Sequence, residues 1–204
     1  MEAPKMPQHH TYYFPKTVDA WKKEVMKAVE VIKLKGSAMT EVAGDEKSNV
    51  PAGIFILLAG LAMALNSYVF PISFMGITYR PGIDTVLIQA VIYAVCSAAG
   101  IFVLDFVSRK LFKGKGKSCE LFRTCGYASL LGVAGILPVA GLLAGLWMLA
   151  IYFNALKNVE KLDDGSAVGA MVVSIVAVVV IFGAIGMVSG GMMFGGGMMS
   201  GWSY

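Results

Sequence analysis

The stretch ILPVAG (Ile136–Gly141) lies in the middle of a run from Cys125 to Phe153 that contains no charged residue. As one α-helix this run of 29 residues would be ~43 Å long, which is long for a single upright membrane crossing. Pro138 removes a backbone hydrogen-bond donor and disfavours helix at Leu137 before it. The stretch therefore predicts a turn between two crossings, and a single helix kinked at the proline is the alternative.

Three further runs are long enough to span a membrane. Val50–Phe70 and Ala167–Met187 contain no charge, and Thr85–Val107 contains one. Each covers ~30 Å as an α-helix, which is the thickness of the hydrocarbon layer. The whole chain of 204 residues is 57% hydrophobic and only 15% charged, too few charges to cover a water-facing surface. We expect an all-α, polytopic integral membrane protein, with a five-helix transmembrane bundle preceded by an amphipathic interfacial helix.

The positions of lysine and arginine also favour two crossings. Basic residues are retained in short cytoplasmic loops. Two crossings place 16 of the 17 basic residues on one side and only Arg80 on the other, whereas one crossing gives 14 against 3. We therefore expect a cytoplasmic N-terminus and an extracytoplasmic C-terminus.

The expected organisation has three parts. Residues 1–49 form a cytoplasmic segment with an amphipathic helix at about 17–35, residues 50–188 form the membrane domain, and residues 189–204 form a Gly/Met-rich extracytoplasmic tail. The five spans are expected at about 50–70, 84–107, 119–137, 139–157 and 166–188.

The N-terminal segment contains a helical stripe. Apolar residues recur at spacings of three and four, at Val18, Trp21, Val25, Val29 and Ile32. Lys22 and Lys23 lie on the other face, and a basic amphipathic helix with a tryptophan on its apolar side is typical of the lipid headgroup region. We expect Trp21, Lys22 and Lys23 to contact lipid or a partner. The alternative is that the helix packs on the ends of its own transmembrane helices.

A basic segment from Arg109 to Lys117 follows the second span. Its end, KGKGKS, contains the GKS of a phosphate-binding loop, but that motif requires glycine five positions before Gly116, where Leu111 stands. We expect its lysines to face anionic lipid. They are Lys113, Lys115 and Lys117.

Residues that support catalysis are scarce. The only histidines, His9 and His10, precede the predicted helices, so no Ser-His or Cys-His pair is expected in the folded part. The one acid within a span is Asp105, which can pair with Arg109 four residues later. We expect no enzyme activity and no cofactor. A small transporter or channel is an alternative, although such proteins usually carry ionisable groups deeper in the membrane.

The C-terminal tail is rich in methionine. Met192 and Met193 are separated from Met198 and Met199 by Phe-Gly-Gly-Gly. Thioethers are soft ligands that suit Cu(I), so these four residues are weak candidates for a metal site, but no cysteine or histidine accompanies them. An apolar tail at the outer interface is the preferred interpretation.

The stretch from Phe112 to Val173 resembles the Yip-domain family, the Rab/Ypt-interacting membrane proteins and their prokaryotic relatives. The resemblance is carried by the basic loop, by the sequence FRxxGYAS that begins at Phe122, and by a short polar loop before the last span. It covers most of the chain, although the motifs are degenerate. The residues expected to be structural in this resemblance and in the analysis above are Gly126, Tyr127, Pro138, Gly141, Trp147, Asp105 and Arg109.

The resemblance implies five transmembrane helices with a cytoplasmic N-terminus, and in eukaryotic members it implies membrane traffic and Rab binding. The DLYGP motif of those members is missing, and Leu130-Leu131 replaces the usual proline after Gly-Tyr. The chain looks more like a prokaryotic member in a cell membrane, so Rab binding is not transferred. We expect a scaffold or accessory subunit that contacts membrane lipids and another membrane protein or complex. A homo-oligomer is compatible with this role, and no nucleic acid is expected.

Overall fold

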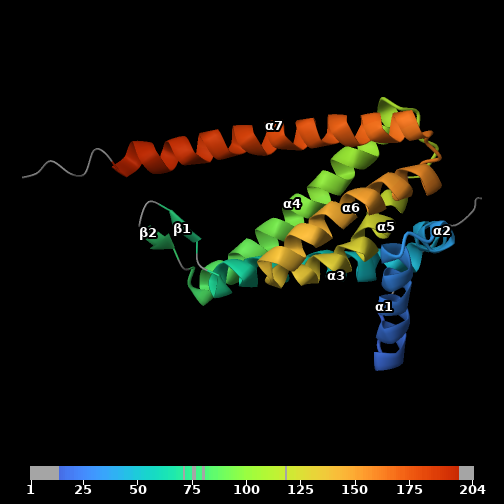
Figure 1. The fold of residues 1–204 in the computed structure, drawn as a ribbon, viewed down its shortest axis with the longest axis horizontal. Helices are drawn as coiled ribbons and strands as arrows, with labels where there is room; N and C mark the ends of the chain where they lie inside the picture. The colour runs from blue at the N-terminus through green and yellow to red at the C-terminus, as the bar shows by residue number, and fades with distance from the viewer. Residues whose placement is uncertain (1–13, 71, 75–76, 80, 118, 198–204) are drawn as a thin grey trace, which may run out of the picture.

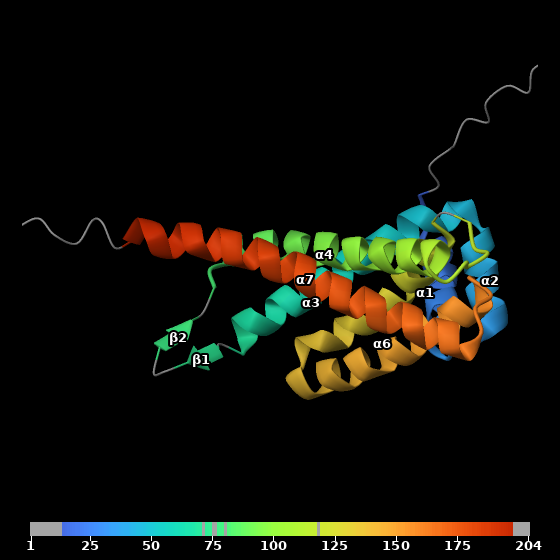
Figure 2. The same cartoon turned by 90° about the horizontal axis from the view of Figure 1, so that it is seen from above.

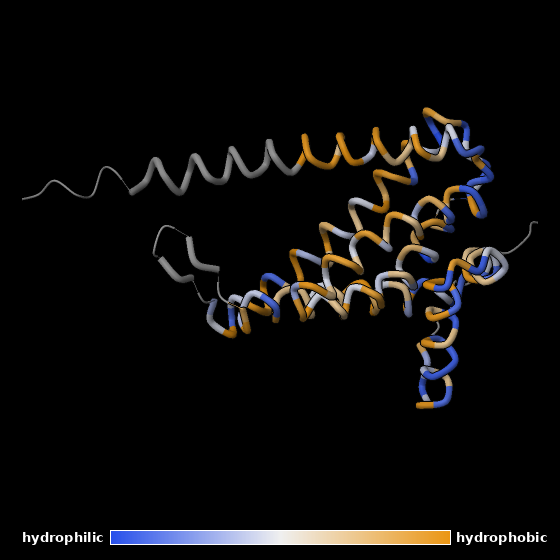
Figure 3. Tube along the Cα trace, viewed as in Figure 1, coloured by the Kyte–Doolittle hydropathy of each residue, from blue (hydrophilic) through white to orange (hydrophobic). Residues whose placement is uncertain are grey.

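A computed structural model describes the backbone of residues 14–70, 72–74, 77–79, 81–117 and 119–197, and the side chains of 14–70, 81–117 and 119–181. Four helices in this part are long and apolar enough to cross a membrane. They are α3 (Asn49–Val69), α4 (Ile83–Lys110), α6 (Pro138–Asn158) and the first 18 residues of α7 (Asp164–Gly197). Their apolar side chains are largely exposed, as expected for surfaces that lipid covers. Figure 3 shows that hydrophobic residues predominate along the described parts of these helices. The protein is an integral membrane protein.

A fifth segment runs beside these helices and combines two helix types. Helix α5 (Glu120–Ala128) continues directly as the 3₁₀ helix η2 (Ser129–Ile136). Because a 3₁₀ helix rises ~2.0 Å per residue against ~1.5 Å in an α-helix, the two together extend ~30 Å. That length equals the hydrocarbon thickness. The prediction of an all-α bundle is confirmed, and its five-helix count holds approximately, since the third member is part α and part 3₁₀.

The chain doubles back at Pro138, as the sequence predicts. Leu137 is extended, with φ −101° and ψ 126°, and Pro138 occupies the first turn of α6. A Cβ on Gly141 would lie 3.1 Å from the Cα of Gly135, so the two arms approach closely at the turn. At the far end the amide of Lys115 donates to the carbonyl of Glu160 at 2.8 Å. The loops that follow α4 and α6 therefore meet, which excludes a single kinked helix.

Two short helices precede the bundle at this same end. Helix α1 (Val18–Ile32) begins at Thr17, whose hydroxyl accepts the amide of Ala20 at 3.2 Å. It is followed by α2 (Gly36–Gly44) and the 3₁₀ turn η1 (Glu46–Ser48), neither of which the sequence analysis anticipated. Figure 1 shows α1 beside α2 at this end of the bundle, projecting on the side away from α7.

A small hairpin occupies the other end. Strands β1 (Ile72–Phe74) and β2 (Ile77–Tyr79) pair antiparallel, with Ile72 opposite Tyr79. They connect α3 to α4 and were not expected. Figure 2 shows that this hairpin and the α1–α2 pair lie at opposite ends of the molecule. The bundle therefore has one end built from α1, α2 and the loops after α4 and α6.

Helix α7 continues through Gly197, past residue 188, where the last span was expected to end. Met192 and Met193 lie on this helix where no side chains are described, and Met198 and Met199 lie outside the described residues. The copper hypothesis therefore stays a prediction.

Candidate interaction site

A buried polar network joins α1 to the bundle. The hydroxyl of Tyr127 on α5 donates to a carboxylate oxygen of Glu24 on α1, and it lies 3.2 Å from the hydroxyl of Ser48. All three residues are buried. Lys27 lies 3.6 Å from the Glu24 carboxylate and 3.5 Å from that of Asp45, so the buried acid has a nearby cation. Because a buried carboxylate is costly without partners, this network fixes the position of α1.

Arg123 forms hydrogen bonds with the segment that leads into α3. Its Nε donates to the side-chain oxygen of Asn49 at 2.8 Å, and a terminal nitrogen donates to the carbonyl of Ala43 at the end of α2. One turn later, Gly126 packs against Ala52 of α3, where an added Cβ would lie 2.6 Å from the Ala52 Cβ. The FRxxGY sequence therefore holds α1, α2 and α3 against one face of α5.

Two further contacts attach α1 to the bundle: a series of aromatic rings that includes Trp21, and a hydrogen bond from Trp147. Trp21 meets Phe55 edge-on at 6.2 Å between ring centroids, and Phe55 meets Tyr127 edge-on at 5.2 Å. The indole nitrogen of Trp147 on α6 donates to the carbonyl of Ile32 at 2.9 Å, at the last residue of α1. Trp147 is thus one of the residues that attach α1 to the bundle.

The face that α1 buries differs from the predicted stripe. The buried residues are Glu24, Ala28 and Val31, with Trp21 partly buried beside them. The stripe was centred on Val25 instead, and Val25 is exposed. The helix thus packs on its own bundle, as the alternative interpretation held, and it leaves an apolar flank outside. Val18 and Val25, which are 85% and 38% exposed, form that flank, and Met26, which is 54% exposed, lies one turn from Lys23. Lys22 and Lys23 are exposed as well.

The segment between α4 and α5, here called the lysine loop (residues 111–117), wraps around a buried acid. Besides the Lys115–Glu160 backbone bond, the amide of Gly116 donates to Glu160 Oε2 at 3.0 Å. A Cβ on Gly116 would lie 2.5 Å from Glu160 Oε1, and one on Gly114 would also collide with this carboxyl group. The glycines therefore face inward while Lys113, Lys115 and Lys117 are exposed.

Glu160 is the residue that the sequence analysis missed. It is fully buried, and burial raises the pKa of its carboxyl group to about 7. Its neighbours include Asp105, which forms the predicted ion pair with Arg109. A sequence signal did exist, because Glu160 follows Tyr152 and Leu156 at intervals of four, the spacing of one helix face, although α6 itself ends at Asn158.

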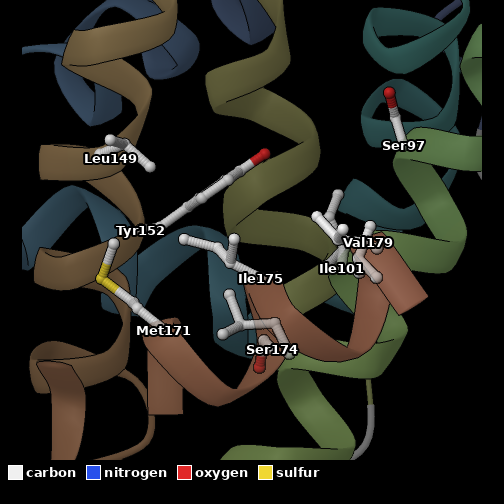
Figure 4. A pocket seen from close by; sticks show the side chains of 11 residues that line it. Ser97, Ile101, Leu149, Tyr152, Met171, Ser174, Ile175 and Val179 are labelled. Atoms are coloured by element: carbon white, nitrogen blue, oxygen red, sulfur yellow. The ribbon is translucent and has the colours of Figure 1, made fainter. Parts of the chain in front are cut away.

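A second feature is a cavity of about 260 Å³ between α4, α6 and α7. In Figure 4 the ring of Tyr152 projects from α6 into the space between the helices, and Met171 and Ile175 line the cavity from α7. Its walls are almost entirely apolar, and it is smaller than the ~300 Å³ of the smallest typical ligand sites. It offers no chemistry for a reaction. Among the described residues, no group of three or more His, Cys, Asp or Glu is placed to hold a metal ion.

Comparison with known protein families matches the model described as Yip1 domain to residues 29–187. The chain belongs to the Yip1-domain family. The Yip1 match begins in α1 and includes every transmembrane segment, the FRxxGY sequence and the lysine loop. Yip1-domain proteins are generally not enzymes. Searches of curated proteins and of solved structures found no match to the chain.

Proposed function

We propose that this Yip1-domain protein is a non-enzymatic scaffold or accessory subunit that organises a membrane or a membrane complex. The observation that carries the proposal is the rigid attachment of α1 across one end of the bundle, with an apolar flank left exposed. Tyr127 and Trp147 hold the helix at two points, while Val18, Val25 and Met26 face outward. An apolar flank beside lysines suits a helix that lies at the lipid headgroups or receives a partner helix.

The lysine loop provides the second proposed surface. Its three exposed lysines lie at the same end as α1, and an ammonium group near an anionic membrane contributes about 1 kcal/mol to binding. This distribution of charge supports a cytoplasmic position for the α1 end, with the β1–β2 hairpin and the C-terminus outside. The departures from the eukaryotic motifs support a prokaryotic cell membrane.

Lipid contact is tested with a fluorophore on α1. Cysteine is introduced at Val25, or at Lys23 on the far flank as the matched control, after Cys96 and Cys119 are replaced by serine. The protein is reconstituted in phosphatidylcholine containing phosphatidylserine with brominated acyl chains. We expect bromine to quench the label at position 25 and to leave the label at position 23 largely unquenched. Equal quenching at both positions would contradict the lipid-facing assignment.

Partner contact is tested in cells. A photo-crosslinking amino acid is placed at Met26 or, as the control, at Lys161, which is exposed in the loop after α6, and we expect discrete protein adducts from position 26 alone. The scaffold proposal fails if position 25 is not quenched by lipid and position 26 forms no adduct. The alternative function, a small transporter, predicts flux into proteoliposomes. In the described spans the acids lie only near the helix ends, at Asp84, Asp105 and Asp164.

A further inference from the structure

Two buried carboxyl oxygens beneath the lysine loop have no hydrogen-bond partner among the described residues. Asp105 Oδ1 and Glu160 Oε1 have no hydrogen bond within the described part of the chain. Asp105 is 3% exposed and Glu160 0% exposed, so water does not reach these oxygens. The two side chains are nevertheless hydrogen-bond neighbours. Two ionised carboxylates in contact would repel strongly in such a site, whereas one shared proton would satisfy both orphan oxygens.

The remaining oxygens decide which acid carries the proton. Asp105 Oδ2 accepts a hydrogen bond from the charged guanidinium of Arg109, a contact that favours negative charge on Asp105 rather than on Glu160. Glu160 Oε2 accepts only the neutral amide of Gly116, at 3.0 Å. We propose that Asp105 and Glu160 bind one proton between them, that Glu160 donates it to Asp105, and that its loss releases the lysine loop.

The surrounding charges fit this arrangement. Arg109 and Asp105 on α4 neutralise each other, and a protonated Glu160 adds no charge to the pair. Glu120 and Cys125 on α5 are the other titratable groups that act on the two acids, and neither supplies a cation. The lysines of the loop are exposed. The buried group is electrically neutral with the proton and carries one net negative charge without it.

Loss of the proton acts on the loop because Glu160 is its main support. The amide of Gly116 donates to the carboxyl group of Glu160, and the amide of Lys115 donates to its backbone carbonyl. The glycines of the loop leave room only for a carboxyl group packed against them. An ionised Glu160 is drawn toward water, and the loop must open to admit it. The position of three exposed lysines is thereby linked to pH. The proton site does not depend on the proposed function, since it requires no lipid and no partner.

The first test detects the proton directly. Infrared difference spectra of the protein in nanodiscs are recorded as the pH rises from 6 to 8, for the native chain, for Glu160→Gln and for Glu41→Gln. Glutamine at 160 can accept from Gly116 and donate to Asp105, so it imitates the protonated acid. Glu41 is an exposed acid on α2. We expect a protonated-carboxyl band that fades with pH in the native chain and in Glu41→Gln, and that is absent in Glu160→Gln. A band that survives in Glu160→Gln overturns the proposal.

The second test measures opening of the loop. Amide hydrogen exchange at Lys115 and Gly116 is compared with that of Glu160→Gln at each pH, which cancels the intrinsic pH dependence of exchange. We expect the ratio to rise about tenfold between pH 6 and pH 8, because an acid with a pKa of about 7 is ionised in roughly one tenth of the molecules at pH 6 and in roughly nine tenths at pH 8. If Glu160→Gln does not fold, exchange of the native amides relative to unstructured peptides must show the same rise.

Two outcomes contradict the proposal here. A ratio that stays flat across this range means that no proton supports the loop. Protection that increases with added sodium ion, and is lost in Glu160→Gln, means that a metal cation occupies the place of the proton.

Discussion

At the scale of single residues, one end of the protein depends on a few buried polar side chains. Tyr127 and Glu24 connect elements 103 residues apart in the chain, and Arg123 and Asn49 connect elements 74 residues apart. Glu160 supports the lysine loop from beneath. A buried polar group is costly without a hydrogen-bond partner, so the loss of one partner from these contacts is costly.

Replacing Tyr127 with phenylalanine tests the α1 attachment. The change leaves the ring contact with Phe55 but removes the hydroxyl that donates to Glu24. We expect a loss of about 1–3 kcal/mol in the free energy of unfolding, the usual cost of leaving a buried polar group unpaired. Thermal unfolding in detergent micelles measures it. The same change at exposed Tyr93 is the control and should have little effect, and equal effects at both positions would remove the role given to the network.

The raised pKa of Glu160 predicts how the stability of the protein changes with pH. Its pKa is raised from 4.5 to about 7 in the folded protein, so the folded state binds this proton more tightly than the unfolded chain. The stability that this proton gives to the folded state is fully present below a pH of about 4.5 and is lost as the pH rises to about 7. We expect the apparent melting temperature to fall between pH 5 and pH 7.5, and Glu160→Gln to remove part of that slope. A slope unchanged by the substitution would contradict the assignment.

At the scale of elements, packing distance between helices sets the arrangement. Helix α5 lies close to α3 because Gly126 has no side chain to keep Ala52 away. The two arms of the hairpin meet closely where Gly141 lies against Gly135. Small residues at such positions let helix backbones approach and increase their van der Waals contact.

Gly126→Ala and Gly145→Ala form a matched pair. Alanine at 126 places a methyl group 2.6 Å from Ala52, whereas at 145 nothing lies within 4 Å. We expect the first change to cost about 1–3 kcal/mol through overpacking. The second should be neutral or gain up to about 1 kcal/mol, because alanine favours helix over glycine. Unfolding in micelles ranks the two, and a Gly126→Ala protein as stable as Gly145→Ala would contradict the close contact.

The helices and the turn were predictable because their causes are local. Long apolar runs define the spans, and Pro138 with the surrounding charges defines the reversal. The 3₁₀ winding of η2 was not predictable, since residues 129–136 are apolar on every side and carry no periodicity that separates the two helix types. The buried face of α1 was missed because Glu24 counts as polar in a pattern, whereas Tyr127, distant in sequence, makes it a core residue. Gly116, whose amide donates to Glu160, lies 44 residues before it in the chain.

At the scale of the whole molecule, the two loops joined by Lys115 and Glu160 define one face of the membrane. The turn at Pro138 lies at the other end of the bundle (Figure 1). The α1–α2 end and the lysine loop therefore lie at the same end of the bundle, and we predict that the chain crosses the membrane an odd number of times.

Cysteine accessibility tests this topology in sealed vesicles. Single cysteines are placed at Lys115, at Lys161 and at Val139, in a chain whose native cysteines are replaced by serine. We expect a membrane-impermeant maleimide to label positions 115 and 161 from the same side and position 139 from the opposite side. Labelling of 115 and 161 from different sides would contradict the fold.

The mixed winding of the third segment has a consequence for the surrounding lipid. If residues 129–136 were wound as α-helix, the segment would shorten by about 4 Å, because eight residues would each rise ~1.5 Å instead of ~2.0 Å. Its apolar length is therefore adjustable without tilting the helix or changing any residue. Lipids with long acyl chains favour the extended winding and lipids with short chains the compact one, which makes hydrophobic mismatch a force on the hairpin.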